Sequence, residues 1–298
     1  MKVFFDNVNF ESNSGPNSFG KKLANTFTKK GHILTHENPD IQLSFIQSYN
    51  HVAPIVLRLD GIYFNSEQAW ETLNAPIKSS YDKAVGVIYQ SNFNKVLTEK
   101  YFGTKKNSTV IHNGTDIDLI NKIPALSSKT LDNYETVWCC ASSWRPHKRL
   151  SENVRYFLEH RNDKSCLIIA GNNPDYRINH PDIYYTGNLD WTSLISLYKR
   201  SQYFIHLALM DHCPNVVVDA RASGCHIICA SSGGTKEIAG STSTIIKDID
   251  WDYQPFKLYE PPSLNFSNKI KLTKTNNIDI NKVSDKYLDF LKANIYHS

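Results

Sequence analysis

Short runs of β-branched and aromatic residues alternate along this chain with longer segments of helical period. The run KVFFDNVNF (2–10) reads as a strand, and the segment 18–31 that follows places Phe19, Leu23 and Phe27 on one helical face. This alternation is typical of parallel α/β sheets, in which helices connect neighbouring strands. Further expected strands are 41–49, 53–61, 84–91 and 108–114, with a helix at 92–103.

The pattern starts again in the second half of the chain, which predicts a second α/β domain. The segment 116–133, with its proline, serines and few apolar runs, is the best linker. We therefore expect an N-terminal domain at 1–125, a second domain at 126–275, and a C-terminal helix at 276–298. The expected strands are 135–143, 165–172, 182–188, 203–209, 226–232 and 243–248, and the expected helices are 150–161, 191–201, 215–224 and 282–296.

Composition excludes several classes of protein. The chain has 298 residues, 41% of them hydrophobic, and a formal net charge of only +4, so a basic nucleic-acid module is disfavoured. All six cysteines lie between Cys139 and Cys229, mostly in apolar runs, and we expect buried reduced thiols. Neither a signal peptide nor a transmembrane segment is recognised, which predicts a cytoplasmic protein; peripheral membrane contact stays open.

The segment GPNSFGKK (15–22) fits the spacing of a phosphate-binding P-loop. A P-loop, however, needs Ser or Thr after its lysine to bind the metal, and here that position is Lys22. A kinase or nucleoside triphosphatase is therefore an alternative of low weight. We favour a turn at Gly15 and Pro16 that lies near a ligand.

The segment WRPHKRL (144–150) directly follows an expected strand, at the edge where α/β sheets bind ligands. Arg145 offers a planar fork of donors and Lys148 a point charge, a pair that suits a diphosphate. A solvated basic turn is the alternative, and His147 is expected to be a surface histidine.

The segment LALMDHCPN, and the helix NVVVDARASG that follows it, form another candidate site. We expect Asn215 to cap this helix, so that the N–H groups of Asn215 and Val216 face an anionic oxygen. Asp219, one turn further on, is able to accept two bonds from vicinal hydroxyls, although an ordinary helix-face charge is the alternative. These motifs together indicate a ligand with a diphosphate, a ribose and a further hydroxyl-rich group.

Three stretches carry a resemblance to a known family. DHCPNVVVDARASGCHIICASSGGTKE (211–237) is similar to an acid-x7-acid signature with a Gly-Gly…Glu ending, and WRPHKRL is similar to an Arg/Lys diphosphate site. VIYQSNFNKVLTEKYFG…STVIHNGTDID resembles the segment that closes an N-terminal domain. In combination they resemble the retaining nucleotide-sugar glycosyltransferases of the GT-B fold, in glycosyltransferase family 4.

This resemblance implies an α/β GT-B fold, with two Rossmann-like domains whose parallel sheets face each other across a cleft. It also leaves room for the C-terminal helix to return to the N-terminal domain. It implies that the second domain holds the donor and the first the acceptor. Two departures stand out: both acids are aspartates where the family usually has glutamates, and LRLDG offers Asp60 where the family has a histidine. The implied roles are diphosphate binding for Arg145 and Lys148, ribose binding for Asp219, sugar and phosphate contact for Asp211 and the backbone of Asn215 and Val216, and nucleobase contact for Gly187, Asn188 and Leu189.

The sequence therefore predicts transfer of a sugar from a UDP- or GDP-sugar, such as UDP-glucose, to a hydroxyl acceptor. The resemblance adds retention of configuration, and fixed charges make a metal or other cofactor unnecessary. Glycan, lipid-linked and nucleic-acid base acceptors all stay open, as does a role for Asp60 as a base or in positioning the acceptor. The alternatives are a nucleotide-sugar epimerase, a silent glycan-binding protein, the P-loop enzyme, and metal binding at DID (116–118) or DIDWD (248–252).

Overall fold

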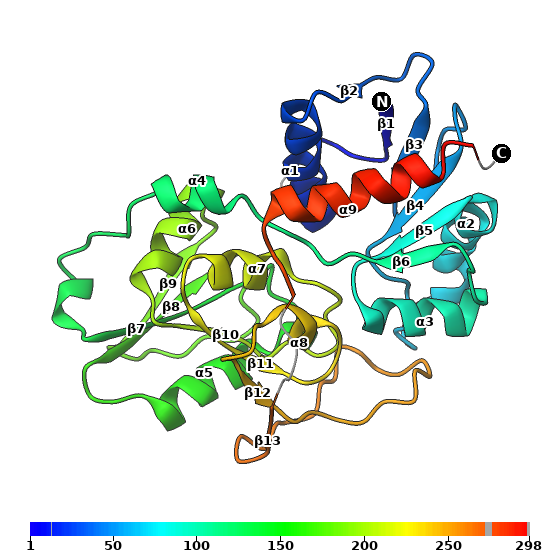
Figure 1. Cartoon of the computed structure of the whole chain (residues 1–298). Coiled ribbons are helices and arrows are strands. Elements are labelled where there is room, and N and C mark those ends of the chain that lie inside the picture. Colours follow the sequence, from blue (N-terminus) through cyan, green and yellow to red (C-terminus); the bar gives the residue numbers. More distant parts are fainter. Residues whose placement is uncertain (13, 272–275, 297–298) are drawn as a thin grey trace. The chain divides into compact units, whose positions relative to one another are not determined.

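The computed structural model describes residues 1–12, 14–271 and 276–296. The chain divides into two compact α/β units (Figure 1). Unit 1 contains Met1–Asp116, Tyr253–Phe256 and the chain from Asn277 on, and unit 2 contains Ile117–Asp252 and Lys257–Asn276. The chain thus passes from unit 1 to unit 2 after Asp116, whereas we expected the domain boundary at residue 125. It returns to unit 1 for a short stretch, Tyr253–Phe256, before its last helix.

Unit 1 is built on a six-stranded sheet of order β2-β1-β3-β4-β5-β6. Every pair of neighbouring strands in it is parallel, as the alternation of strands and helices predicts. The order changes direction at β1, so the carboxyl ends of β1 and β3 flank a switch point. The strands are β1 (Lys2–Asp6), β2 (Ile33–Leu34), β3 (Ile41–Phe45), β4 (Ile55–Leu59), β5 (Gly86–Tyr89) and β6 (Ser108–Val110).

Two helices from opposite ends of the chain share the core of unit 1. Helix α1 (Gly15–Lys29) buries Phe19, Leu23 and Phe27, the face that the sequence predicts. Helix α9 (Ile280–Ala293) joins the same apolar cluster through residues such as Tyr287, and Figure 1 shows α9 in red beside α1 in blue. The expected return of the C-terminal helix to the first unit is therefore observed.

Unit 2 is built on a seven-stranded sheet of order β13-β12-β11-β10-β7-β8-β9. Its strands are parallel except for β13, which runs antiparallel to β12. The first strand of the unit, β7, lies between β8 and β10, so the order changes direction there. The strands are β7 (Thr136–Ala141), β8 (Ser165–Ala170), β9 (Ile183–Gly187), β10 (Tyr203–His206), β11 (His226–Ala230), β12 (Thr244–Ile246) and β13 (Lys269–Ile270).

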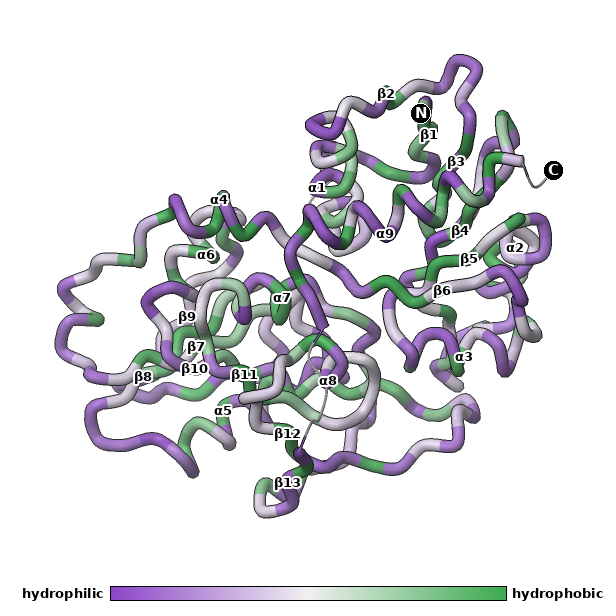
Figure 2. Tube along the Cα trace, viewed as in Figure 1, coloured by the Kyte–Doolittle hydropathy of each residue, from purple (hydrophilic) through white to green (hydrophobic). Residues whose placement is uncertain are grey.

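The helices of unit 2 connect these strands and cover the sheet. They are α4 (Ile117–Lys122), α5 (Leu150–His160), α6 (Trp191–Arg200), α7 (Asn215–Ala222) and α8 (Thr235–Ile238). The apolar colour in Figure 2 follows the central strands, whereas helices such as α5 carry hydrophilic residues as well. Trp138, Leu167, Ile205 and Ile228 belong to one buried cluster on this sheet.

All strands and helices that we expected from the sequence are present, but several elements were not anticipated. The largest is α2 (Trp70–Lys83), which contains Pro76 and buries the polar side chains of Asn74 and Ser80. A proline inside a helix and a mixed buried face hide the apolar period that identifies a helix. The short α4 lies within the expected linker, and β2, α8 and β13 have only two to four residues each. Helix α3 (Asn92–Phe102) agrees with the prediction.

The P-loop alternative is wrong. Gly15 to Lys22 form the first two turns of α1, whereas a P-loop wraps its phosphate in an open loop. Lys22 donates a hydrogen bond from Nζ to Thr115 Oγ1 at 3.1 Å. The six cysteines are free and buried, as expected. In the described parts of the chain, no helix has the length and apolar character that crossing a membrane requires.

Candidate active site

The switch point of unit 2 lies between β7 and β10, which are adjacent and parallel. In open α/β sheets, ligands bind at the carboxyl ends of the strands beside such a point. The loop after β7 carries Arg145 and Lys148, and the loop after β10 carries Asp211. The sheet order therefore brings together two segments that lie more than fifty residues apart in the sequence.

Lys148 and Asp211 are in direct contact. Lys148 Nζ lies 2.5 Å from Asp211 Oδ2, and the two side chains keep 18% and 15% of their surface exposed. Lys148 ends a short 3-10 turn, Pro146–Lys148, that Arg145 precedes, and Arg145 itself is exposed. This leaves both cations accessible to an anion in solution.

Asp211 also accepts hydrogen bonds from its own surroundings. His206 Nε2 lies 3.0 Å from Oδ2, and the backbone N–H of His212 donates to Oδ1 at 3.0 Å. Burial alone opposes the charged form, but Lys148 and His206 outweigh it and hold the pKa of Asp211 well below the ordinary carboxyl value. Asp211 is therefore a fixed anion.

The histidines beside this ion pair are neutral at physiological pH. Burial lowers the pKa of His206, although Asp211 acts in the opposite sense. Burial, together with Lys148, lowers the pKa of His147 to about 3. His147 is half-buried and its ring lies 5.5 Å from that of Tyr259, so it is not the surface histidine that we expected. The positive charge of the site thus belongs to Arg145 and Lys148.

The Gly-Gly pair of the sequence supports the backbone of Asp211. Gly233 has φ +74°, and a Cβ atom there would lie 2.4 Å from the carbonyl oxygen of Asp211. The next residue, Gly234, donates its backbone N–H to that same oxygen at 2.7 Å. Only glycine at 233 allows this close approach of two backbones.

A buried ion pair anchors the loop after β7. Arg149, in the left-handed region at φ 50°, donates from both terminal nitrogens to Asp248, at 2.7 and 3.1 Å. Ser232 Oγ donates to Asp248 as well, at 2.5 Å. Sequence reasoning missed this role, because Asp248 was assigned only to a metal-binding alternative; an arginine at the end of a basic motif was the available signal.

Helix α7 begins one residue earlier than expected. Pro214 occupies the N-cap and Asn215 is the first helical residue, so the expected capping by Asn215 is wrong. The N–H groups of Asn215 and Val216 still belong to the first turn, at the positive end of the helix dipole. Asp219 is only 4% exposed, and the indole N–H of Trp191 donates to its Oδ2 at 3.0 Å. It is therefore a buried acid with an assigned partner and not a solvated helix-face charge.

Backbone contacts connect Gly187 to the loop after β7. Gly187 ends β9 with φ +70°, and its carbonyl oxygen accepts the N–H of Gly171 at 2.7 Å. Gly171 in turn lies against the loop after β7, since a Cβ there would stand 1.8 Å from Ser142 O. Asn188 and Leu189 follow Gly187 at the same edge of the sheet. Gly171 was missed, although a glycine directly after an apolar strand is a recognisable signal.

Asp60 and Gly15 belong to unit 1. Asp60 follows β4 and forms an ion pair with Arg58, which is completely buried. Arg58 also donates to Asn113 Oδ1 at 2.7 Å and to the hydroxyl of Tyr287 at 3.1 Å. Gly15 is the first residue of α1. Asp60, which sequence reasoning selected as a site residue, is thus the partner of the buried guanidinium of Arg58. The sequence did not reveal this pairing.

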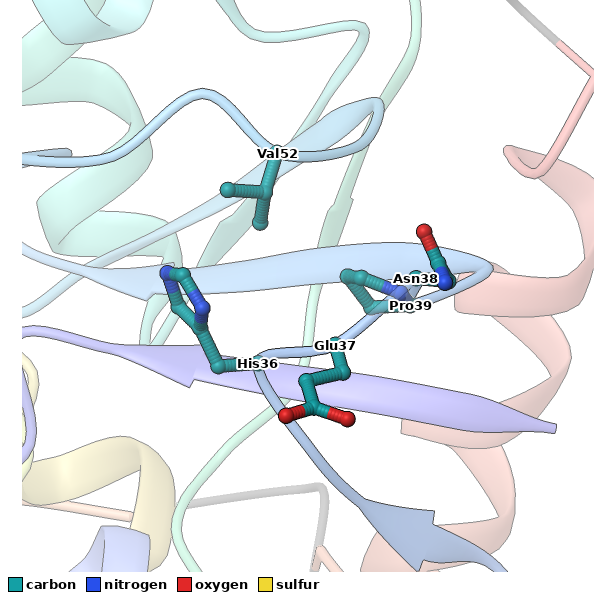
Figure 3. A pocket seen from close by; sticks show the side chains of 5 residues that line it. All are labelled: His36, Glu37, Asn38, Pro39 and Val52. Carbon is teal, nitrogen blue, oxygen red and sulfur yellow. The ribbon is translucent and has the colours of Figure 1, made fainter.

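Unit 1 also contains a hollow of about 420 Å³ on the loop between β2 and β3 (Figure 3). His36, Glu37, Asn38 and Pro39 line it from this loop, and Val52 lines it from the loop after β3. None of these residues was a candidate. The hollow is a separate feature from the switch point of unit 2.

Among the described residues, no group of three or more His, Cys, Asp or Glu side chains is arranged to hold a metal ion. Asp116 pairs with Lys29 at 3.6 Å, and Asp248 pairs with Arg149. In each of the aspartate clusters 116–118 and 248–252, one carboxylate is therefore already paired with a cation.

Comparison with known proteins gives a match to one family and to solved structures. Residues 129–253 match the family described as "Glycosyl transferases group 1". The solved structure of HepE from Anabaena, in complex with UDP and glucose, is similar over 98% of this chain and 100% of its own, at 12% identity and a TM-score of 0.67. No curated protein sequence matches the chain.

Two further solved structures are similar to this chain. Sucrose-phosphate synthase from Thermosynechococcus elongatus covers 84% of the chain with 86% of its own length, at 12% identity and a TM-score of 0.66. A glycosyltransferase from Rickettsia africae covers 100% with 99% of its own length, at 15% identity and a TM-score of 0.61. The chain therefore has the GT-B fold of two Rossmann-like units, and its segment 129–253 is similar to the glycosyl transferases group 1 family.

Proposed function

We propose that the protein is a glycosyltransferase that moves a sugar from a nucleotide diphosphate to a hydroxyl acceptor. The observation that carries this proposal is the Lys148–Asp211 pair at the switch point of unit 2. A cation and an anion at one accessible point suit a ligand with a diphosphate and a hydroxyl-bearing sugar. The match of residues 129–253 to the glycosyl transferases group 1 family supports the same chemistry.

In this reaction the bond between the anomeric carbon and the diphosphate oxygen breaks, and its electron pair stays on the diphosphate. Arg145, Lys148 and the first turn of α7 supply fixed positive charge and dipoles for the oxygen that gains charge. The acceptor oxygen forms the new bond to the anomeric carbon, and its proton passes to the departing diphosphate. Because these groups are preorganised in the protein, we propose that no metal is required.

Asp211 and Asp219 divide the recognition of the donor in this proposal. Asp211, an anion held beside Lys148, contacts the transferred sugar, and Asp219 accepts from the ribose hydroxyls at α7. The N–H of Trp191 holds the carboxylate of Asp219 in a fixed orientation. Gly187, Asn188 and Leu189 provide the surface for the nucleobase, and UDP-sugars are the first donors to test, since HepE was solved with UDP and glucose.

The acceptor is assigned to unit 1, with Asp60 as a positioning group. A carboxylate that already pairs with a buried guanidinium is better suited to orient a hydroxyl than to remove its proton. We include retention of configuration in the proposal because the acid-x7-acid segment resembles that of retaining enzymes.

The test is an assay of the full chain with UDP- and GDP-sugars in the presence of EDTA, using simple glycans and lipid-linked sugars as acceptors. We expect acceptor-dependent release of UDP or GDP, together with a product whose anomeric configuration matches that of the donor. Release only after addition of Mg²⁺ or Mn²⁺ would contradict the metal-free site. Interconversion of the donor without transfer would identify an epimerase instead.

A further inference from the structure

His206 is a polar residue at a buried position of the sheet, where apolar side chains are usual. It ends β10, the strand beside β7, and is 4% exposed. Side chains alternate along a strand, so His206 shares its face with Phe204, and the two rings are nearly parallel at 6.3 Å. Burying an imidazole is unfavourable unless its nitrogens are hydrogen-bonded, which directs attention to its partner.

That partner is Asp211. His206 Nε2 lies 3.0 Å from Asp211 Oδ2, the same oxygen that Lys148 Nζ contacts at 2.5 Å. The ionised carboxylate only accepts hydrogen bonds, so Nε2 carries the proton of the neutral ring. A neutral donor binds Asp211 without repelling the neighbouring lysine.

The two donors of Asp211 differ in what a ligand does to them. Lys148 is 18% exposed, and an incoming diphosphate competes with Asp211 for its charge. His206 is enclosed by the sheet and carries no charge, so a diphosphate does not draw it away. The backbone N–H of His212 holds the other carboxylate oxygen.

We infer that His206 is a positioning residue that holds Asp211 in place while Lys148 turns to the diphosphate of the donor. This inference rests on the proposed function, and deepens it by adding a buried residue behind the Lys148–Asp211 pair. The expected consequence is specific, because loss of His206 should affect the step in which Asp211 contacts the sugar and not the binding of the nucleotide.

The test compares His206→Phe with His226→Phe in the full chain. His226 is a matched control, because it begins the neighbouring β11 and its Nε2 lies 2.9 Å from Thr244 Oγ1, at the opposite edge of the sheet. We expect kcat to fall about tenfold to a hundredfold in His206→Phe, the range for a lost hydrogen bond to a charged group, with little change in the affinity for UDP. His226→Phe should leave both values unchanged.

A conservative substitution of His206 and a double variant provide a second test. In His206→Gln the amide Nε2 is able to donate to Asp211, so we expect most of the rate to return. In an Asp211→Asn background, His206→Phe should have little further effect, because the two residues act as one unit. Equal kcat in the wild type and His206→Phe, or fully additive losses in the double variant, would overturn the inference.

A spectroscopic measurement tests the inference without requiring that the protein transfers sugar. The ring nitrogens of His206, observed by ¹⁵N NMR at pH 7, should show a neutral imidazole protonated on Nε2. A cationic ring, or a proton on Nδ1 alone, would overturn the inference even if the protein transfers sugar. An inactive wild type with the expected ring signal would instead contradict the proposed function.

Discussion

The carboxyl edges of the two sheets each hold a cluster of charged side chains, and the two clusters differ in how far their cation is exposed to solvent. In unit 1, Arg58 is completely buried and its donors go to Asp60, Asn113 and Tyr287. In unit 2, Lys148 and Asp211 are partly exposed at the switch point. The first cluster encloses its cation within the fold and the second presents its cation to solvent, so we assign stability to Arg58 and ligand binding to Lys148.

The largest effect is expected in unit 1. Arg58→Met removes the cation from a buried cluster and leaves Asp60 without its partner, which typically costs about 3–5 kcal/mol. The guanidinium also lies 4.5 Å from the ring centroid of Phe19, so packing changes as well. We expect hydrogen exchange to accelerate in β4 and α9, the elements that Arg58 and Tyr287 connect.

Lys78→Ala is the matched control for that variant. Lys78 pairs with Asp82 on the surface of α2, one helical turn away, and such exposed pairs contribute only about 0.3–0.5 kcal/mol. Similar stability of the two variants, measured by chemical denaturation, would contradict the enclosed character of the Arg58 cluster.

The next effect concerns catalysis in unit 2. Lys148→Ala, and separately Arg145→Ala, should lower kcat about 100-fold or more, because a preorganised charge is lost from the leaving diphosphate. Arg145 is exposed, so its substitution should change the free energy of unfolding little, whereas Lys148→Ala also removes a partner of Asp211 and should lower the free energy of unfolding. Steady-state kinetics beside a denaturation curve measures both quantities. Full activity in both variants would move the diphosphate site elsewhere.

Asp219 provides a smaller effect on donor affinity. Asp219→Asn replaces a carboxylate with an amide that has one acceptor oxygen, and affinity should fall about tenfold to a hundredfold. A 2′-deoxyribose donor already lacks one of the bonds and should lose less. Trp191→Phe removes the indole donor and serves as the control for orientation. Equal losses for both donors, measured by titration, would remove Asp219 from the site.

A separate prediction concerns the pH dependence of stability in unit 2. The pKa of His147 in the folded protein is about 3, below that of an unfolded histidine, so the unfolded chain binds the extra proton first. Stability should therefore fall as the pH drops from about 6.5 towards 3. His147→Phe should flatten this slope in acid denaturation curves, and an unchanged slope would contradict a neutral, buried ring.

The sequence predicts the fold well because both units follow a simple alternation of strands and helices. Phe19, Leu23 and Phe27 occupy the buried face that their spacing indicates. Helix α2 was missed, because Pro76 and the buried Asn74 interrupt the apolar period. Its formation depends on tertiary packing that no local pattern records.

The candidate site was predictable in its exposed part and not in its buried part. Lys148 and Asp211 follow strands in recognisable motifs, and parallel strand order brings their loops together. His206 and Arg58 each stand inside an apolar run, where the sequence gives no sign of the carboxylate that each one contacts. Such pairings depend on which strands become neighbours, and the register of a sheet is a property of the whole fold.

The central claim is that unit 2 binds a nucleotide diphosphate through fixed cations at the switch point. Isothermal titration of UDP and GDP into the full chain in EDTA tests it most directly, with Lys148→Ala and Lys78→Ala as the variants compared. We predict that at least one nucleotide binds the wild type and Lys78→Ala equally without metal, and binds Lys148→Ala at least tenfold more weakly. Binding that requires a divalent ion, or that is unaffected by Lys148→Ala, would contradict the account.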